Sequence, residues 1–427
     1  MDAANQKIIY VLLDGIGDLP HPSLNNLTPL DAAHTPHLDK LAEQGCMGQA
    51  ISVGRGISPQ SDIAVFNMLG YDFKNGGYVG RGVIESIGCG IDFRDGDLAL
   101  RGNFASVDNN LRLVDRRSGR VILKEEAQAI CKTLREKILL SDKNASFIIE
   151  PTIAHRVVLR FRHQSIKLSE NITNTDPAYS KVNGIGVAKP QNDEMYLEKS
   201  KPLESTEGSI YAANLVNEFT DQSLKLLRDH PINIARPKIG KMPINAILVR
   251  DAGNKYPTVE PIKEKYGVDV ACIVDMPVEV GISKVLGMEA YEAGDINDYK
   301  RKALTAARII EKFGIVYVHI KGPDEFGHDG EAKGKMSNIE QIDNLFFGNL
   351  RKSLTTDDVT VVISGDHSTP CIKRAHSDDP IPLLISGNFI RKDASRRFTE
   401  YYASKGSLGL VMGSDVLSTA IRYNRLK

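Results

Sequence analysis

Apolar residues form short continuous blocks towards both ends of the chain, with amphipathic stretches between them. The blocks at residues 7–13, 315–320, 358–364 and 382–386 are typical of buried strands, because strands covered on both faces lack polar alternation. Helices are predicted near 36–44, over 297–313 and over 337–354. The first has Thr35 as its N-cap, Pro36 at its first position and Gly45 at its end. Strands separated by such helices predict an α/β fold, with a mostly parallel sheet flanked by helices.

The pattern changes between residues 91 and 255. Short strands of alternating polarity are predicted within 91–120. Further strands are predicted near 146–149 and 155–161, and helices over about 123–139 and 209–229. Because βα patterns continue on both sides, we interpret 91–255 as an inserted α+β domain. The first domain, residues 1–90 and 256–427, is then discontinuous.

Composition narrows the class of protein. A chain of 427 residues predicts at least two domains, and its 41% hydrophobic and 25% charged residues are those of a globular protein. A net charge of zero argues against a nucleic-acid-binding surface across the molecule. No apolar run is long enough for a membrane span or a signal peptide, and five scattered cysteines fit a reducing cytoplasm. None of these features sets an oligomeric state.

Acidic and histidine side chains follow three of the predicted strands. Asp14-Gly15 follows the first, "KGPDEFGHDG" with Asp324 and His328 follows the second, and Asp366-His367 follows the third, with His376 shortly afterwards. Each cluster alone is commonly a polar turn, and the glycines and proline of "KGPDEFGHDG" predict a bent loop in which Glu325 and Asp329 are ordinary carboxylates.

Parallel strands direct their carboxyl ends to the same edge of a sheet, so these clusters are expected to converge. Carboxylate oxygens and imidazole nitrogens suit divalent ions such as manganese, zinc or magnesium. The number of candidate ligands favours a two-metal centre, and such centres commonly serve phosphoryl chemistry.

The segment "GISPQSDIAVFNMLGYD" offers a nucleophile, Ser61, at the start of a predicted helix. Serine is also a favoured N-cap, so the position has a purely structural interpretation. The functional interpretation rests on the helix N-terminus, whose free N–H groups and positive dipole end can hold a phosphate.

Together with "SDIAVFNMLGYD", "GRGVIESIGCGI" and "HSDDPIPLLI", these clusters resemble the archaeal type of cofactor-independent (2,3-bisphosphoglycerate-independent) phosphoglycerate mutase, in the alkaline phosphatase superfamily. The resemblance covers nearly the whole chain. It implies an alkaline-phosphatase-like fold and an isomerase of glycolysis and gluconeogenesis that interconverts 3-phosphoglycerate and 2-phosphoglycerate through a phosphoserine at Ser61. It further implies two divalent ions, Mn²⁺ in the first instance with Mg²⁺, Co²⁺ or Zn²⁺ as alternatives, and no 2,3-bisphosphoglycerate. The implied ligands are Asp14, Ser61, Asp366 and His367 for one ion and Asp324, His328 and His376 for the other.

A small phosphorylated carboxylate substrate requires cations, which the resemblance places in the inserted, lid-like domain. The expected substrate-binding residues are Arg116, Arg117, Arg120, His155, Arg156, Arg250 and Lys265. Two positions depart from the family pattern: Val65 stands where a histidine is expected, and Asp251 where a glycine is usual. The alternatives are a metal-dependent phosphatase or phosphopentomutase-like enzyme using the same serine, or a non-catalytic metal-binding protein.

Overall fold

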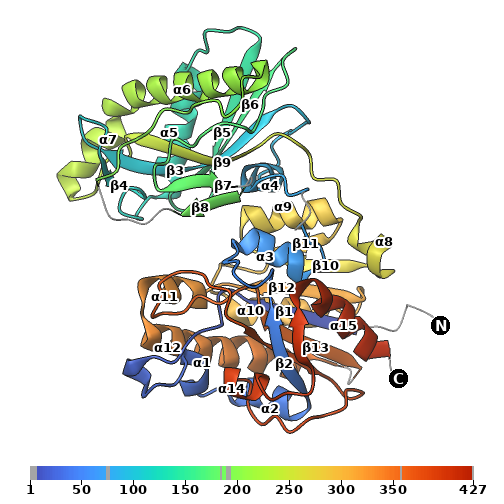
Figure 1. Cartoon of the computed structure of the whole chain (residues 1–427). Helices are drawn as coiled ribbons and strands as arrows, with labels where there is room; N and C mark the ends of the chain where they lie inside the picture. Colours follow the sequence, from blue (N-terminus) through green and yellow to red (C-terminus); the bar gives the residue numbers. More distant parts are fainter. Residues whose placement is uncertain (1–6, 74–76, 183–184, 189–193, 356–357, 426–427) are drawn as a thin grey trace. The chain divides into compact units, whose positions relative to one another are not determined.

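The computed structural model describes the chain except residues 1–6, 74–76, 183–184, 189–193, 356–357 and 426–427 (Figure 1). It contains two compact units. Unit 1 comprises Met1–Gly77, Val259–Asp275 and Ile282–Lys427, and unit 2 comprises Tyr78–Thr258 and Met276–Gly281. The first junction therefore precedes α4 (Arg81–Gly88), which the sequence analysis assigned to the first domain. This helix packs closely on the sheet of unit 2, since a Cβ on its Gly82 would lie 2.8 Å from the carbonyl oxygens of Ala99 and Asp251.

Unit 1 is built on an eight-stranded sheet of order β11-β10-β12-β1-β13-β14-β2-β15. Its strands are β1 (Lys7–Leu13), β2 (Gly45–Ile51), β10 (Val270–Ile273), β11 (Glu289–Tyr291), β12 (Ile315–Ile320), β13 (Val359–Gly365), β14 (Ile381–Ser386) and β15 (Gly409–Met412). Only β14 runs antiparallel to its neighbours, so the predicted mostly parallel sheet is confirmed.

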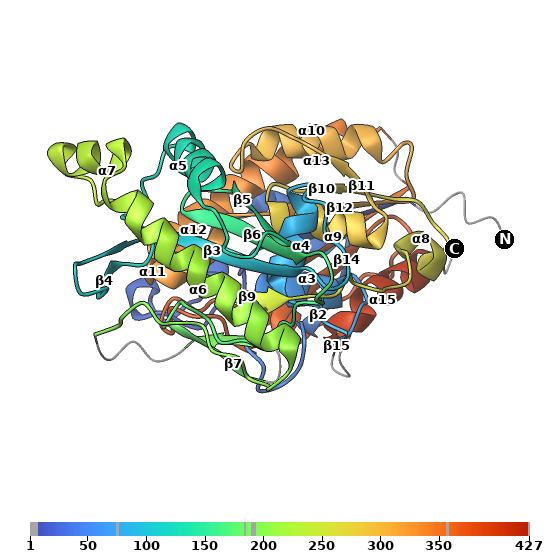
Figure 2. The same cartoon turned by 90° about the horizontal axis from the view of Figure 1, so that it is seen from above.

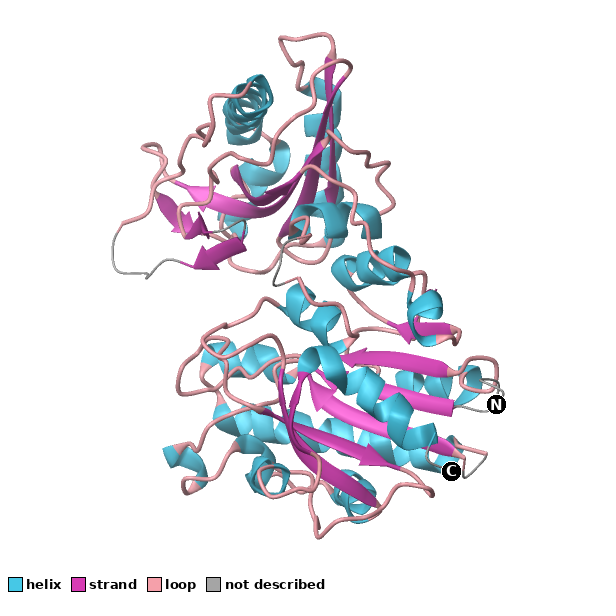
Figure 3. Ribbon diagram, turned by 45° about the vertical axis from the view of Figure 1, so that its right-hand side comes forward, coloured by secondary structure: helices cyan, strands magenta, loops and turns pink. Residues whose placement is uncertain are grey.

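Helices cover both faces of this sheet (Figure 3). Ile9 and Val11 of β1 pack in a buried cluster with residues of α2, α10, α12, η4 and α13, whereas the hydroxyl of Tyr10 points the other way and donates to the Met68 carbonyl in α3. The helices of unit 1 are η2 (Pro22–Leu24), α1 (Pro29–Ala32), α2 (Pro36–Glu43), α3 (Ser61–Met68), α8 (Ile262–Tyr266), α10 (Tyr299–Ile309), α11 (Pro323–Asp329), α12 (Ala332–Ile342), the π-helix η4 (Asp343–Phe347), α13 (Gly348–Ser353), α14 (Glu400–Ala403) and α15 (Gly413–Arg425); α9 (Pro277–Leu286) has residues in both units.

Two local predictions differ in detail from the structure. The helix predicted over 337–354 is interrupted by the π-helix η4, whose Asp343 accepts hydrogen bonds from the backbone N–H groups of His37 and Leu38. Thr35 is the N-cap of α2 and Pro36 its first residue, as predicted, but the Thr35 side chain makes no capping hydrogen bond. Asp343 caps the helix instead, from elsewhere in the chain. Among the described residues, no helix combines the length and hydropathy that a membrane span requires.

Unit 2 is an α+β unit, as predicted. Its sheet has the order β4-β3-β6-β5, and β9 also pairs with β3, antiparallel to it. Residues of α5 and α6 form one buried core with alternate residues of the sheet, and α6 lies along the sheet in Figure 2. The elements are β3 (Leu98–Val107), β4 (Leu113–Asp115), α5 (Lys124–Lys137), β5 (Ala145–Pro151), β6 (Arg156–His163), the hairpin β7 (Tyr179–Val182) and β8 (Ile185–Ala188), α6 (Glu207–Arg228), α7 (Pro231–Ala235), η3 (Arg236–Ile239) and β9 (Ala246–Gly253).

Candidate active site

The predicted ligands of unit 1 lie at the carboxyl ends of three adjacent parallel strands. Leu13, the last residue of β1, is level with Ile320 at the end of β12 and with Gly365 at the end of β13. The loops that begin with Asp14 and Asp366, and the segment that carries Asp324, therefore start side by side. Strand order and register thus bring together residues more than 300 positions apart.

Asp14, Asp366 and His367 form the first group of candidate ligands, and all three are buried. The Nε2 atom of His367 lies 3.5 Å from Asp14 Oδ1 and 3.3 Å from Asp366 Oδ2. The hydroxyl of Ser61 lies 3.1 Å from the same nitrogen, so Ser61 borders this group.

Asp324, His328 and His376 form the second group. The Nε2 atoms of the two histidines are 3.1 Å apart, and they lie 3.6 Å and 3.4 Å from the Asp324 carboxylate. The rings of His376 and His367 stack with centroids 3.8 Å apart, so the two groups adjoin.

Asp324 and His328 lie on a helix, not in the predicted bent loop. Pro323 occupies the first turn of α11 and Gly330 ends it with a left-handed φ of 77°. Spacing of four places Asp324 and His328 on one face of that helix. Gly327 stands between them because a Cβ there would lie 2.3 Å from the Thr369 carbonyl oxygen.

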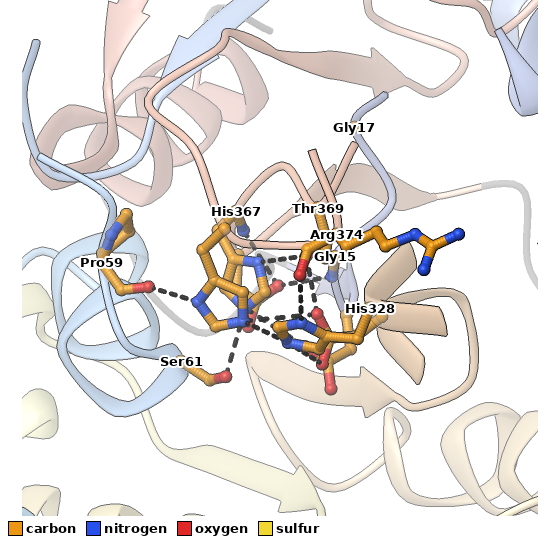
Figure 4. A network of polar contacts seen from close by, with 12 residues as sticks. Gly15, Gly17, Pro59, Ser61, His328, His367, Thr369 and Arg374 are labelled. Atoms are coloured by element: carbon orange, nitrogen blue, oxygen red, sulfur yellow. Dashed lines mark hydrogen bonds and ion pairs between the residues drawn. The ribbon is translucent and has the colours of Figure 1, made fainter. Parts of the chain in front are cut away.

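Hydrogen bonds orient the histidines of the second group (Figure 4). His376 Nδ1 lies 2.7 Å from the Pro59 carbonyl oxygen, and His328 Nδ1 lies 3.2 Å from that of Arg374. A carbonyl oxygen only accepts, so each Nδ1 donates and each Nε2 is the atom left to face an ion. Such outer contacts fix the tautomer and ring orientation of metal-ligating histidines.

Burial and mutual charge perturb these groups. Burial raises the pKa of Asp14 to about 7; Asp366 and Asp324 add to this effect and Lys321 opposes it. Burial lowers the pKa of His367 to about 3, so its imidazole is neutral at pH 7. Burial alone would also lower the pKa of His376, but the Asp324 carboxylate outweighs it and raises that pKa to about 9.

The chemistry of the first group fits a divalent metal ion. Asp366 Oδ1 accepts from the backbone N–H groups of Gly15 and His367, and Asp14 Oδ2 pairs with Lys321 at 2.8 Å. The other two oxygens, Asp14 Oδ1 and Asp366 Oδ2, are buried and have no hydrogen-bond partner among the described residues. A buried carboxylate oxygen without a partner is costly, and a cation beside His367 Nε2 would satisfy both. The second group offers the same donor types.

Ser61 is the first residue of α3, and its N-cap is Gln60, so the N-cap interpretation of Ser61 is wrong. Its side chain faces His367. Val65, where the family pattern has a histidine, is buried within α3.

Two further basic side chains contact the candidate ligands, Lys321 and His319, and neither was predicted. Lys321 pairs with Asp14, and His319 Nε2 lies 3.5 Å from Asp366 Oδ2. The sequence does contain an indication of their role, because both are basic residues at the end of an otherwise apolar block.

Several predicted substrate-binding arginines meet in unit 2. Because alternate residues of β3, β6 and β9 face the α5/α6 core, Arg101, Arg156 and Arg250 lie on the opposite face of the sheet. We call the following set the arginine cluster: Arg81, Arg101, Arg116, Arg117, Arg156 and Arg250. Arg81 and Arg101 were missed, although Arg101 is the single arginine within the predicted strand "GDLALRGNFASVD".

Three carboxylates partly neutralise the cluster. Asp176 accepts from Arg116 Nη2 and from Arg250 Nη1, both at 2.7 Å, and Glu85 pairs with Arg81 at 2.7 Å. Six guanidinium groups against Glu85, Asp176 and Asp251 leave an excess of positive charge. Burial, with Arg81 and Arg250 nearby, lowers the pKa of Arg101 to about 9, which still leaves it charged at pH 7.

The remaining predicted substrate-binding residues differ in position. His155 adjoins the cluster, and burial together with Arg156 and Arg117 lowers its pKa to about 3. Arg120 is exposed beside Arg117. Lys265 lies in unit 1 on α8, with its ammonium 4.6 Å from the ring centre of Tyr71. Substrate binding by all three stays a prediction.

Asp251 has a left-handed φ of 56°, a conformation that favours glycine. It lies where the register of the β3–β9 pairing shifts, between the pairs Ala99–Gly253 and Arg101–Arg250. Its Oδ2 lies 3.4 Å from Arg250 Nε and 3.8 Å from Arg101 Nη1. The aspartate thus adds a negative charge to the cluster.

Comparisons with known proteins agree on one family. The profile of the family described as "2,3-bisphosphoglycerate-independent phosphoglycerate mutase" matches residues 42–233. A protein of that name from Aeropyrum pernix is 39% identical to this chain, over 95% of this chain and 96% of its own length. Another, from Methanopyrus kandleri, is 35% identical, over 97% of this chain and 95% of its own length. Two solved structures are similar to this chain. A protein from Pyrococcus horikoshii has a TM-score of 0.79 and 29% identity, covering 98% of this chain and 97% of that one. A cofactor-independent phosphoglycerate mutase from Thermoplasma acidophilum has a TM-score of 0.64 and 28% identity, covering 98% of this chain and all of that one.

Proposed function

Because the chain belongs to the 2,3-bisphosphoglycerate-independent phosphoglycerate mutase family, and is therefore an isomerase that interconverts 3-phosphoglycerate and 2-phosphoglycerate, we propose that Ser61 is its phosphoryl acceptor. The observation that supports this most strongly is the position of the Ser61 hydroxyl, 3.1 Å from His367 Nε2 at the first turn of α3. The first turn of a helix has free N–H groups, which can hold a phosphoryl group.

We propose two divalent ions, Mn²⁺ in the first instance. Asp14, Asp366 and His367 with Ser61 would hold one, and Asp324, His328 and His376 the other. When bound, such ions neutralise charge on the transferring oxygens and lower the pKa of a coordinated hydroxyl. The fit of the first site rests on the two buried carboxylate oxygens that have no hydrogen-bond partner, Asp14 Oδ1 and Asp366 Oδ2.

The proposed reaction then consists of two phosphoryl transfers, to Ser61 and back to glycerate. The Ser61 oxygen loses its proton and forms a bond to phosphorus as the bond from phosphorus to the 3-oxygen of glycerate breaks. The 3-oxygen takes up one proton, which balances the proton that Ser61 loses. Glycerate stays bound, reorients, and its 2-hydroxyl accepts the phosphoryl group back from Ser61. The 2-hydroxyl must compete with water, so a phosphatase is the alternative outcome of the same chemistry.

The arginine cluster is the proposed binding site for the anionic groups of the substrate. Guanidinium groups form bidentate hydrogen bonds with carboxylate and phosphate, and the excess positive charge suits a triply charged phosphoglycerate. Asp176 holds Arg116 and Arg250 in fixed orientation, which reduces the entropy lost when a ligand binds. The cytoplasm is the proposed location, consistent with five free cysteines.

The test supplies 3-phosphoglycerate and Mn²⁺ without 2,3-bisphosphoglycerate and measures 2-phosphoglycerate and free phosphate separately. The proposal expects 2-phosphoglycerate, and a phosphorylated peptide containing Ser61 after rapid acid quenching. Free phosphate alone would assign the chain to the phosphatases. Product without a phosphopeptide would exclude Ser61 as the acceptor.

A further inference from the structure

Thr369 lies where three segments of the candidate active site meet, and every one of its polar atoms is used to join them. Its N–H donates to the Gly17 carbonyl at 3.0 Å, and its carbonyl accepts from Lys335 Nζ at 3.0 Å. Its hydroxyl lies 3.1 Å from His367 Nδ1 and 2.6 Å from Asp324 Oδ1. The residue is fully buried.

The hydroxyl of Thr369 connects one ligand of each group. An ionised carboxylate only accepts, so the single hydroxyl hydrogen goes to Asp324. The hydroxyl oxygen must then accept from His367 Nδ1, and that nitrogen carries the proton. The hydrogen bonds thus run from His367 to Thr369 (Figure 4) and from Thr369 to Asp324. They leave the lone pair of His367 on Nε2, the atom that lies near Asp14 and Asp366.

Close packing holds this side chain in place. A Cβ on Gly15 would lie 2.7 Å from Thr369 Oγ1, and one on Gly327 would lie 2.8 Å from its methyl carbon. Both neighbours are therefore glycines at points where Thr369 occupies the space. Lys335, itself fully buried and 2.8 Å from Asp18, fixes the backbone of Thr369 to the segment that follows Asp14.

We propose that Thr369 is a positioning residue whose hydroxyl orients one ligand of each metal group, so that a single side chain sets the affinity of both ions. The proposal rests on the two-metal centre of the proposed function and adds a residue to it. Thr369 donates no atom to an ion; it acts through His367 and Asp324. Outer-shell hydrogen bonds of this kind are worth about 10- to 100-fold in metal affinity.

The experiment measures Mn²⁺ binding to the full chain by calorimetry, and by the loss of the free-ion electron paramagnetic resonance signal, with no substrate present. Thr369→Val removes the hydroxyl at nearly constant volume, and Thr369→Ser retains it. Thr360→Val is the matched control: Thr360 is buried at the other end of β13, and its hydroxyl donates to Asn424 at 2.8 Å, away from the ligands. If Thr369→Val does not fold, Thr369→Ala replaces it with the same expectation.

The expected result is that the wild type binds two Mn²⁺ ions and that Thr369→Val weakens both by about 10- to 100-fold. Thr369→Ser and Thr360→Val should each stay within about threefold of the wild type, because they keep the hydroxyl link. Three results would overturn this inference but leave the two-metal centre standing. They are a wild-type affinity for Mn²⁺ in Thr369→Val, a lower affinity for only one of the two ions in that variant, and an equal loss of affinity in Thr369→Ser. A wild type that binds no Mn²⁺ would overturn the two-metal centre itself and this inference with it.

Discussion

The Lys321 ammonium lies 2.8 Å from Asp14 Oδ2, so a buried cation already holds one oxygen of this carboxylate while the other, Oδ1, faces His367. The two residues follow adjacent parallel strands, β12 and β1. This pairing explains how a carboxylate that burial would otherwise protonate can present a charged oxygen to a metal ion.

Replacing Lys321 with Met should destabilise the metal-free protein. It leaves the buried Asp14 carboxylate without its cation, and breaking a buried ion pair by removing one partner costs about 3 kcal/mol or more. Urea unfolding in EDTA measures the loss. Lys263→Met is the control, because Lys263 and Asp269 form an exposed ion pair whose removal costs less than about 1 kcal/mol. Equal losses in the two variants would contradict the role of Lys321.

Replacing Ser61 with Ala should abolish turnover and leave the fold and Mn²⁺ binding at the second group unchanged, since the nucleophile alone is lost. Mutase activity, circular dichroism and metal titration measure the three properties. Ser58→Ala, an exposed change in the same loop, should keep full activity. Retained activity in Ser61→Ala would rule out the phosphoserine route.

Replacing Arg101 with Lys should raise the KM for 3-phosphoglycerate by about 10- to 100-fold, the worth of one hydrogen bond to a charged group. Lysine keeps the charge but lacks the planar fork. Steady-state kinetics at fixed salt measures the change. Arg160→Lys is the control, because Arg160 is also buried in the sheet of unit 2 and lies outside the arginine cluster. A KM shift in the control and none in Arg101→Lys would remove Arg101 from the substrate site.

Glu85 should make the stability of the protein depend on pH in acid. Burial opposes its ionisation, but Arg101, Arg81 and Arg156 lower its pKa from 4.5 in the unfolded chain to about 2. A lowered carboxyl pKa contributes stability that is complete above pH 4.5 and is lost as the pH falls towards 2. Glu85→Gln should therefore cost about 3 kcal/mol at pH 7, and the difference from the wild type should shrink between pH 4.5 and 2.

Urea unfolding across this pH range measures the difference. Glu136→Gln serves as the control, because Glu136 belongs to an exposed pair with Lys132 whose loss costs less than about 1 kcal/mol. A constant difference between wild type and Glu85→Gln at every pH would contradict the ion-pair origin of the stability.

Local sequence determined the secondary structure and the chemical types at the strand ends. The continuous apolar blocks predicted β1 and β12 with the bounds that the structure has, because buried strands need apolar residues on both faces. The rule that parallel strands end at one edge was enough to predict that Asp14, Asp324 and Asp366 would lie close together. The residue types at those ends then indicated metal chemistry.

Tertiary structure alone decided which atoms meet and which groups support them. A pattern along the chain does not give strand order, so the contact of Thr369 with Asp324, the capping of α2 by Asp343 and the meeting of Arg81 with Arg101 were not predicted. Residues that usually interrupt secondary structure also led to a wrong local prediction. Gly322 and Pro323 begin the helix α11 and Gly330 ends it, where a loop was expected. The physical reason is the distance along the chain over which each feature is determined. Helix and strand periodicity depends on neighbours within a few residues, whereas the orientation of a metal-ligating side chain depends on hydrogen bonds and packing with segments far along the chain.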